Sequence, residues 1–356
     1  TGVRNDVSLA GLNHKLGYRG TTNTLLNFGE QGGAVGYRVG QPGDGLRCMF
    51  HMMNEARIGV GLGATMLGAA GYAASLAYAR QRTQGRAVAA GGRDAAAPPV
   101  RLVEHADIRR MLLAQKAYVE GGMALALYCA WLVDEQRTGA PAASAEAGTL
   151  LEMRTPVAKS WPSEWALEAN SLAIQIHGGY GYTRDFPVEQ YWRDNRLNMI
   201  HEGTHGIQAL DLLGRKVVMQ DGAGLAAIGR KVDATIARAR TAPEFVPHAD
   251  ALAEAYAHLT AATTAAWATG NPEEALANAT PYLQAFGHTV LAWIWLDVAI
   301  CAQAALAKPG ANEPLAHGLL AACTYFFHYE LPRIGAWLGV VETRDATCRT
   351  MAEEWF

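Results

Sequence analysis

The segment from Ile58 to Ala79 carries no charged residue, and this strongly limits how the chain can fold. A segment of this length can span a bilayer, and Gly59 and Gly63 form a G-x-x-x-G pattern that is typical of paired membrane helices. Glycine and alanine outnumber leucine in it, however, so its average hydrophobicity is low. We therefore expect a buried helix that packs closely against its neighbours through small residues, and no membrane span.

The chain after about residue 44 has the periodicity of further helices. A second helix is expected from about residue 103, because apolar residues recur there at spacings of four and seven (Ile108, Leu112, Val119, Met123 and Leu127). A linker is expected over 138–148, which is rich in Ala, Gly and Pro, and a third long helix from about 149 to Gln175. The glycine-rich stretch 177–187 ends that helix, a short helix starts near Val188, and the residues after 221 form one more helical block.

Residues 1–43 differ from the rest of the chain. The runs DVSLAGLN, NTLLNFGE and AVGYRVG are short, favour β-structure and are separated by glycine-rich turns, so we expect strands here. The chain also begins at Thr1 without an initiator methionine or a targeting segment. We expect it to be a C-terminal fragment, or one piece of a split enzyme.

Charge and cysteine content narrow the class of protein. The net charge is −3 and only 18% of the residues are charged, so no nucleic-acid partner is expected. Five cysteines lie far apart in the sequence with no C-x-x-C pair (Cys48, Cys129, Cys301, Cys323 and Cys348). Their odd number favours free, buried thiols in a reducing compartment, so a cytoplasmic location is expected.

Residues 201–205 read His-Glu-Gly-Thr-His, which matches the H-E-x-x-H pattern of zinc peptidases. Such a site needs both histidines on one continuous helix and a third protein ligand. Gly203 costs about 1 kcal/mol inside a helix, and the candidate third ligands within reach are aspartates (Asp211, Asp221 and Asp233). We therefore expect no metal here: Glu202 has another role, and His201 and His205 need no metal.

The longer stretch LAIQIHGGYGYTRDFPVEQYWRDNRLNMIHEGTHGIQ resembles the C-terminal helical domain of the acyl-CoA dehydrogenases. It contains Q-I-x-G-G-x-G, P-V-E, R-D and E-G-T-x-x-I-Q in the order and spacing of that family. The resemblance covers residues 8–217, and the following block resembles the extra helical domain of a long subfamily that includes the 3-methylmercaptopropionyl-CoA dehydrogenases. It implies a mainly α fold: the last strands of the middle β-domain over 1–43, the helical bundle over 44–220 and the additional helical domain over 221–356.

The resemblance also implies an activity, the FAD-dependent α,β-dehydrogenation of an acyl-CoA thioester. The family's base lies in the E-G-T turn, which places it at Glu202; it removes the α-proton while flavin accepts the β-hydride. A dry environment raises the basicity of such a carboxylate. Gly203 lets the backbone approach the thioester, and Asn54 and Arg57 match side chains that face the CoA moiety. Thr204 is expected to contact the cofactor, and its hydroxyl suits the N-cap position of the next helix.

Further cofactor residues follow from the same resemblance. Arg82 and Gln84 match ligands of the FAD pyrophosphate across a dimer, and His105 matches a histidine near the partner's flavin. Gln175, Gly178 and Gly179 match the segment along the adenosine part of FAD. The sequence departs from the family at Gly85, where an aromatic residue is usual, and at Gly206, where many relatives have a glutamine that touches the flavin.

The expected partners are an acyl-CoA substrate, the N-terminal portion of the same enzyme or a companion subunit, a second copy of the complete unit, and an electron acceptor such as electron-transfer flavoprotein. An acyl-CoA oxidase remains an alternative, because it shares the base and differs in oxygen access. A non-catalytic, DNA-binding flavoprotein of the same fold is a further alternative. It would need a basic C-terminal surface, whereas the block after 221 has comparable numbers of acids and bases.

Overall fold

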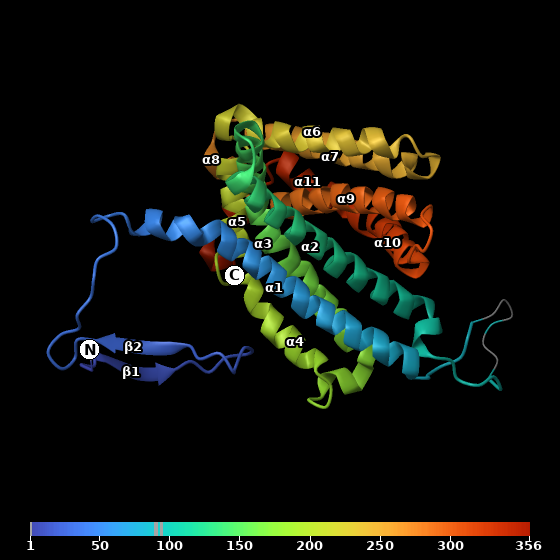
Figure 1. The fold of residues 1–356 in the computed structure, drawn as a ribbon, viewed down its shortest axis with the longest axis horizontal. Coiled ribbons are helices and arrows are strands. Elements are labelled where there is room, and N and C mark those ends of the chain that lie inside the picture. The colour runs from blue at the N-terminus through green and yellow to red at the C-terminus, as the bar shows by residue number, and fades with distance from the viewer. Residues whose placement is uncertain (1, 89–91, 93–94) are drawn as a thin grey trace.

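A computed structural model describes residues 2–88, 92 and 95–356, without the side chains of Phe50, His51 and Asn54. Helices make up most of this part of the chain, and the described residues form a single two-stranded sheet. The sheet lies apart from the helices, which pack together into one body (Figure 1). The predicted fold class, mainly α with a remnant of β-structure, is confirmed.

The sheet is an antiparallel hairpin of β1 (Val7–Leu12) and β2 (Thr24–Phe28), with an irregular register between Leu9 and Gly11. Much of its apolar surface is exposed; for example, Phe28 is 67% exposed. The loop between the strands reaches the helices, because the backbone N–H of Tyr18 donates to Asp194 at 2.6 Å. The prediction of a third strand at 34–40 is wrong. This run is irregular, and glycines with positive φ angles precede and end it.

Three long helices lie side by side: α1 (Gly45–Gln81), α2 (Ala106–Thr138) and α3 (Pro141–His177) (Figure 1). As expected, α1 packs through small residues. A Cβ atom at Gly61 would overlap the carbonyl oxygen of Ala158, and one at Gly68 would lie 2.9 Å from the Cβ of Ala166. Several of its bulky apolar side chains face outward, for example Met66, which is 49% exposed, whereas Tyr72 and Leu76 pack against the core.

The start of α3 corrects the expected linker over 138–148. The helix begins at Pro141, eight residues before the predicted start. Proline is accommodated in the first helical turn, where its missing N–H has no helical partner, and the following residues, Ala-Ala-Ser-Ala-Glu-Ala, include several strong helix formers. Helix propensity therefore outweighs the composition that suggested a linker.

Short elements follow α3 and lead into the C-terminal block. They are a 3-10 turn (Gly178–Tyr182), α4 (Val188–Asn195), a second 3-10 turn (Arg196–Met199), α5 (His205–Asp211) and a π-helical turn (Leu212–Lys216). The block contains α6 (Ala223–Ala239), α7 (Val246–Ala266), α8 (Pro272–Leu276), α9 (Ala279–Leu306), α10 (Glu313–Tyr325), α11 (Ile334–Glu342) and α12 (Thr347–Thr350).

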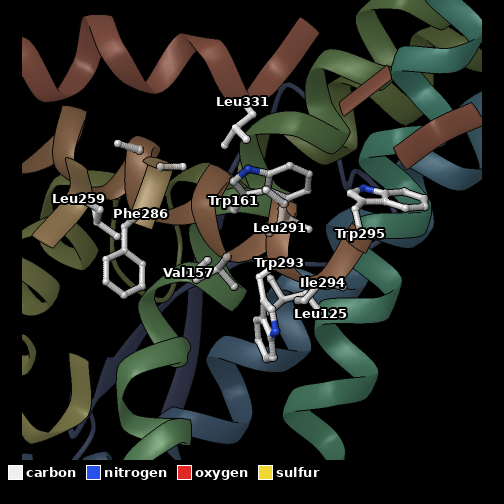
Figure 2. Close-up of a cluster of buried hydrophobic side chains, with 14 of the residues drawn as sticks. Leu125, Val157, Trp161, Leu259, Phe286, Leu291, Trp293, Ile294, Trp295 and Leu331 are labelled. Atoms are coloured by element: carbon white, nitrogen blue, oxygen red, sulfur yellow. The ribbon is translucent and has the colours of Figure 1, made fainter. Parts of the chain in front are cut away.

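The bundle and the C-terminal block share one hydrophobic core. Figure 2 shows side chains of α9 that lie among residues of α2 and α3 (Leu125, Val157, Trp161, Leu291, Trp293, Ile294 and Trp295). Trp295 also donates its indole N–H to the carbonyl oxygen of Ala117 in α2 at 3.2 Å. The block is therefore joined to the bundle by packing as well as by the chain.

Two described helical segments, Glu55–Gln81 and Ala279–Leu306, are long and apolar enough to cross a membrane. Core helices of globular proteins pass the same test, and 33% and 56% of the two most apolar windows are buried here. All five cysteines are free. Cys129 and Cys323 are buried as expected, but the other three are exposed, so the expectation of buried thiols is wrong for Cys48, Cys301 and Cys348.

Candidate active site

The residues Glu202, Gly203 and Thr204 form a tight turn immediately before α5. Glu202 has φ 56° and Gly203 has φ 92°, and a non-glycine residue in this region is uncommon and costs energy. The hydroxyl of Thr204 accepts a hydrogen bond from the backbone N–H of Ile207 at 3.5 Å. The predicted N-cap is therefore confirmed, and the turn presents the Glu202 side chain at the surface of this chain.

Gly203 is required by its surroundings as well as by its φ angle. A Cβ atom at this position would lie 2.6 Å from Nε2 of Gln208, whose side chain is fully buried. The same amide donates to the carbonyl oxygen of Glu202 at 3.0 Å. Gln208 therefore fixes the backbone of the turn from within α5.

The two histidines of the H-E-x-x-H pattern do not share a continuous helix, because α5 begins at His205 and the Glu202 turn precedes it. Nδ1 of His201 lies 3.1 Å from the carbonyl oxygen of Leu197, whereas Nδ1 of His205 lies 3.2 Å from Oε2 of Glu164. In the part of the chain that the structure describes, no group of three or more His, Cys, Asp or Glu side chains could hold a metal ion. The pattern therefore lacks the geometry of a zinc peptidase site.

Two buried cations lie near the turn. Lys159 of α3 is fully buried, and its ammonium has no hydrogen-bond partner among the described residues. Burial lowers the pKa of Lys159 to about 8, and the charge of Arg57 adds to this, while the carboxylate of Glu202 acts in the opposite direction. Arg57 is 6% exposed and forms an ion pair with Asp211 at 3.0 Å. The exposed carboxylate of Glu202 thus faces buried positive charge.

A cavity of about 530 Å³ lies close to this region, between α2, α3, α4 and the turn 196–199. Glu164, Glu168, Arg196 and Arg333 are its charged lining residues. None of the residues predicted to bind substrate or cofactor lines this cavity. Asn54, predicted to face CoA, lies outside the described side chains.

A second group of predicted residues lies beyond the end of α1. Arg82 and Gln84 are exposed, and a guanidinium N–H of Arg82 lies 3.4 Å from the side-chain oxygen of Gln84. Nε2 of His105 lies 2.8 Å from the carbonyl oxygen of Gln84. Gly85, the departure from the usual aromatic residue, has φ 71°, a conformation that favours glycine. The sequence change therefore suits the local backbone.

The end of α3 lies beside this loop, because the rings of Tyr78 and His177 stack with centroids 4.4 Å apart. Gln175 is exposed there. A Cβ atom at Gly178 or Gly179 would meet no described atom within 4 Å, so the backbone is open to close approach. The structure therefore brings the candidates for the pyrophosphate and adenosine contacts to one end of the bundle.

The two groups of predicted residues are far apart. Arg57 lies within α1 and Arg82 directly follows it, so the rise of 1.5 Å per residue places their Cα atoms about 37 Å apart. The Glu202 turn lies near Arg57, and the glycine-rich end of α3 lies near Arg82. The predicted site residues therefore form two separate groups in this chain.

Two protein-family models match the chain. The family model described as "Acyl-CoA dehydrogenase, C-terminal domain" matches residues 43–218, and "Acetyl-CoA dehydrogenase C-terminal like" matches residues 228–352. The chain belongs to the acyl-CoA dehydrogenase family. This confirms the resemblance seen in the sequence.

Individual relatives support the same assignment. A 3-methylmercaptopropionyl-CoA dehydrogenase of Ruegeria pomeroyi is 37% identical over 88% of this chain and 53% of the relative. Two crystal structures share the fold: ACDH-11 of Caenorhabditis elegans in complex with C11-CoA (TM-score 0.73, 20% identity, 98% of this chain and 55% of that one) and an acyl-CoA dehydrogenase complexed with FAD from Bacillus anthracis (TM-score 0.70, 17% identity, 94% and 56%). The chain spans 53% to 60% of the length of four curated relatives that it matches.

Two side chains near the Glu202 turn, Lys159 and Glu164, were not predicted from the sequence. Both lie on α3, about forty residues before the turn, and neither belongs to a local motif. A lysine inside an otherwise buried run is a usable signal, because lysine is rarely fully buried without a partner. Glu164 gives no such signal in the sequence.

Proposed function

We propose that this chain is the part of an FAD-dependent acyl-CoA dehydrogenase that carries the catalytic base. Glu202 takes the α-proton of an acyl-CoA thioester, and FAD, when bound, accepts the β-hydride. The observation that carries this proposal is the Glu202 turn: an exposed carboxylate on a strained backbone, directly before α5 and near the buried Lys159. Strained turns of this kind concentrate at functional sites.

The surrounding residues suit proton removal. Glu202 is exposed at the surface of this chain, where a substrate can reach its carboxylate, and the buried Lys159 lies close enough to interact electrostatically with it. Gly203 has no side chain between the turn and a bound thioester, so a backbone N–H can donate to the thioester carbonyl as negative charge develops on it. A bound acyl chain would exclude water from the turn, and a dry environment makes a carboxylate a stronger base.

The residues at the other end of the bundle fit the pyrophosphate and adenosine of FAD. Arg82 offers an exposed guanidinium, Gln84 and Gln175 offer amide groups, and the backbone at Gly178 and Gly179 is unobstructed. Guanidinium and backbone N–H groups are the usual ligands of phosphate oxygens in proteins. Thr204, at the turn, would lie toward the reacting end of a flavin instead.

This separation supports a dimer of the complete unit. A distance of about 37 Å along α1 exceeds what one extended dinucleotide can bridge. In the dimer, each chain would therefore supply Glu202 to one FAD molecule, and Arg82 and His105 to the second FAD molecule. The N-terminal portion of the enzyme or a companion subunit would cover the open side of α1 and the hairpin, where apolar residues are exposed (Leu25, Phe28, Leu62 and Met66). Electron-transfer flavoprotein in the cytoplasm is the proposed acceptor.

The substitution Glu202→Gln in the complete enzyme tests the assignment of the base. Flavin content and CoA-ester binding should be retained, while the rate of flavin bleaching by acyl-CoA falls by roughly 10²–10⁴-fold, because Gln keeps the volume and removes the base. Glu244→Gln, at an exposed glutamate between α6 and α7, is the matched control and should bleach normally. Normal bleaching by Glu202→Gln would refute the assignment.

A second experiment tests the need for a partner. Residues 1–356 expressed alone should hold FAD weakly, because they supply the adenosine contacts without the strands that would flank the flavin ring. Flavin content and mass in solution are the measurements. A monomer with stoichiometric flavin would contradict the proposal, and hydrogen peroxide release by the complete enzyme would favour the oxidase.

A further inference from the structure

His205 occupies a distinctive place, as the first residue of α5 and three positions after Glu202. Its side chain is 13% exposed, and Nδ1 lies 3.2 Å from Oε2 of Glu164 on α3. Its other ring nitrogen is buried without a hydrogen-bond partner in the described part of the chain. The imidazole is therefore enclosed and held from one side by a carboxylate.

Glu164 has a second partner in the C-terminal block. The side-chain amide of Gln284, on α9, donates a hydrogen bond to the same oxygen of Glu164 that faces His205. Burial acts to raise the pKa of the Glu164 carboxyl, but the hydrogen bonds from His205 and Gln284 and the nearby charge of His205 and His288 together hold this pKa below its ordinary value. An ionised carboxylate thus joins α3, α5 and α9.

The position of the Glu202 turn depends on where α5 begins. Helix α5 has only seven residues, and the cap from Thr204 to Ile207 is long, at 3.5 Å. Glu202 itself has a positive φ angle, which persists only where the surrounding structure enforces it. Gln208 fixes the turn from one side, and the pair of His205 with Glu164 joins the first turn of α5 to α3.

We propose that His205 and Glu164 are positioning residues for Glu202, and that Gln284 extends this support to the C-terminal block. The inference rests on the proposed function, because it assigns the pair a role in placing the base. In this proposal the second histidine of the H-E-x-x-H pattern, His205, holds the turn that carries Glu202, and no metal is needed. The extra block also gains a direct link to the active site, through α9.

The test uses the complete enzyme with five variants. His205→Ala and Glu164→Gln remove the pair, Gln284→Ala removes its support, and His205→Asn retains a donor near the Nδ1 position. Glu146→Gln is the matched control. It also weakens a contact between α3 and the block, the pair of Glu146 with Lys231 at 3.0 Å, but it lies about 27 Å along α3 from Glu164.

Flavin reduction by acyl-CoA should slow by about 10- to 100-fold in His205→Ala and Glu164→Gln, since a small misplacement of a reacting group is costly. The rate of flavin reduction should fall less in Gln284→Ala and should be close to that of wild type in His205→Asn. Binding of a non-reducible CoA thioester should be unchanged in all of these variants. A rate for His205→Ala within twofold of wild type would overturn the proposal. So would a loss that Glu146→Gln reproduces.

A second readout is independent of catalysis. Hydrogen exchange of the segment 201–211, measured without substrate, should be several-fold faster in His205→Ala and Glu164→Gln and unchanged in Glu146→Gln. Unchanged exchange in His205→Ala would reject the anchor even if activity fell. If wild type reduces no flavin, the proposed function fails, and faster exchange in the variants would still establish the anchor.

Discussion

Helices α1 and α9 are both strongly apolar, but they differ in the size of the side chains that they bury. Both contain a segment long and apolar enough to cross a membrane. Helix α9 buries large side chains such as Phe286, Trp293 and Trp295, and its neighbours surround it (Figure 2). Helix α1 buries small residues, including Gly61 and Gly68, and directs larger apolar residues such as Leu62 and Met66 outward.

The difference indicates what each helix stabilises. Large buried side chains on α9 remove apolar area from water within this chain, so they contribute to its own stability. Small residues on α1 let the helix approach α3 closely, but they bury little area each. The exposed larger side chains of α1, such as Leu62 and Met66, gain burial only when another surface covers them. Helix α9 therefore stabilises this chain through large buried side chains, whereas the exposed apolar side chains of α1 are available for contact with another surface.

A pair of identical substitutions tests this comparison most strongly. Leu291→Ala on α9, at a fully buried position, should lower the free energy of unfolding by about 2–5 kcal/mol. Leu62→Ala on α1, where the side chain is 38% exposed, should change it by no more than about 0.5 kcal/mol. Urea denaturation of this chain measures both, and equal losses would show that α1 is packed as fully as α9.

Glycine substitutions on α1 should have opposite signs. Gly61→Ala should destabilise the chain by about 1–3 kcal/mol, because the added methyl group overlaps the backbone of Ala158. Gly63→Ala should stabilise it by about 0.5–1 kcal/mol, because no described atom lies within 4 Å of the added group and alanine is the better helix former. Shifts of the thermal midpoint in the same direction would contradict the packing described for α1.

The smallest expected effect concerns Lys159, on the side of α3 that faces the Glu202 turn. Its pKa in the folded chain is about 8, below the value of about 10.4 for an exposed lysine. Between these pH values the unfolded chain binds more protons, so stability rises with pH in this window. Lys159→Met should remove this rise.

Unfolding at pH 7, 8, 9 and 10 measures the dependence on Lys159. Lys308→Met, at an exposed lysine, should leave the rise unchanged. A rise that persists in Lys159→Met would mean that other groups produce it.

Local features of the site were predictable from the sequence. The E-G-T turn and the Thr204 cap depend on residues within a few positions of each other, and both the cap and the family are confirmed. Glu202 as the base stays a prediction. Lys159, Glu164 and Gln284 were not predicted, because their contacts join distant parts of the chain; Gln284 lies 120 residues from Glu164.

Errors in the fold have local physical reasons. The stretch 141–148 looked like a linker by composition, yet proline at the first helical position and the alanines after it extend α3. The run 34–40 favoured a strand by residue type, but the glycines around it bend the backbone. The sequence pattern indicated Gly59 and Gly63 as the contact residues of α1, but Gly61 is the glycine that closely approaches α3. Which glycines face α3 depends on the rotation of α1 about its axis, and the sequence does not give this rotation.

The unbroken length of α1 has a consequence for inheritance. In the proposed dimer, the helix keeps the base and the Arg82 end of one chain in different active sites. An allele with Glu202→Gln and an allele with Arg82→Ala would each be inactive in pure form. A mixed dimer, however, would combine both defects in one site and leave the other site with an intact base and an intact Arg82. Two such alleles should therefore complement each other in one cell, which two defects within one group of site residues could not do.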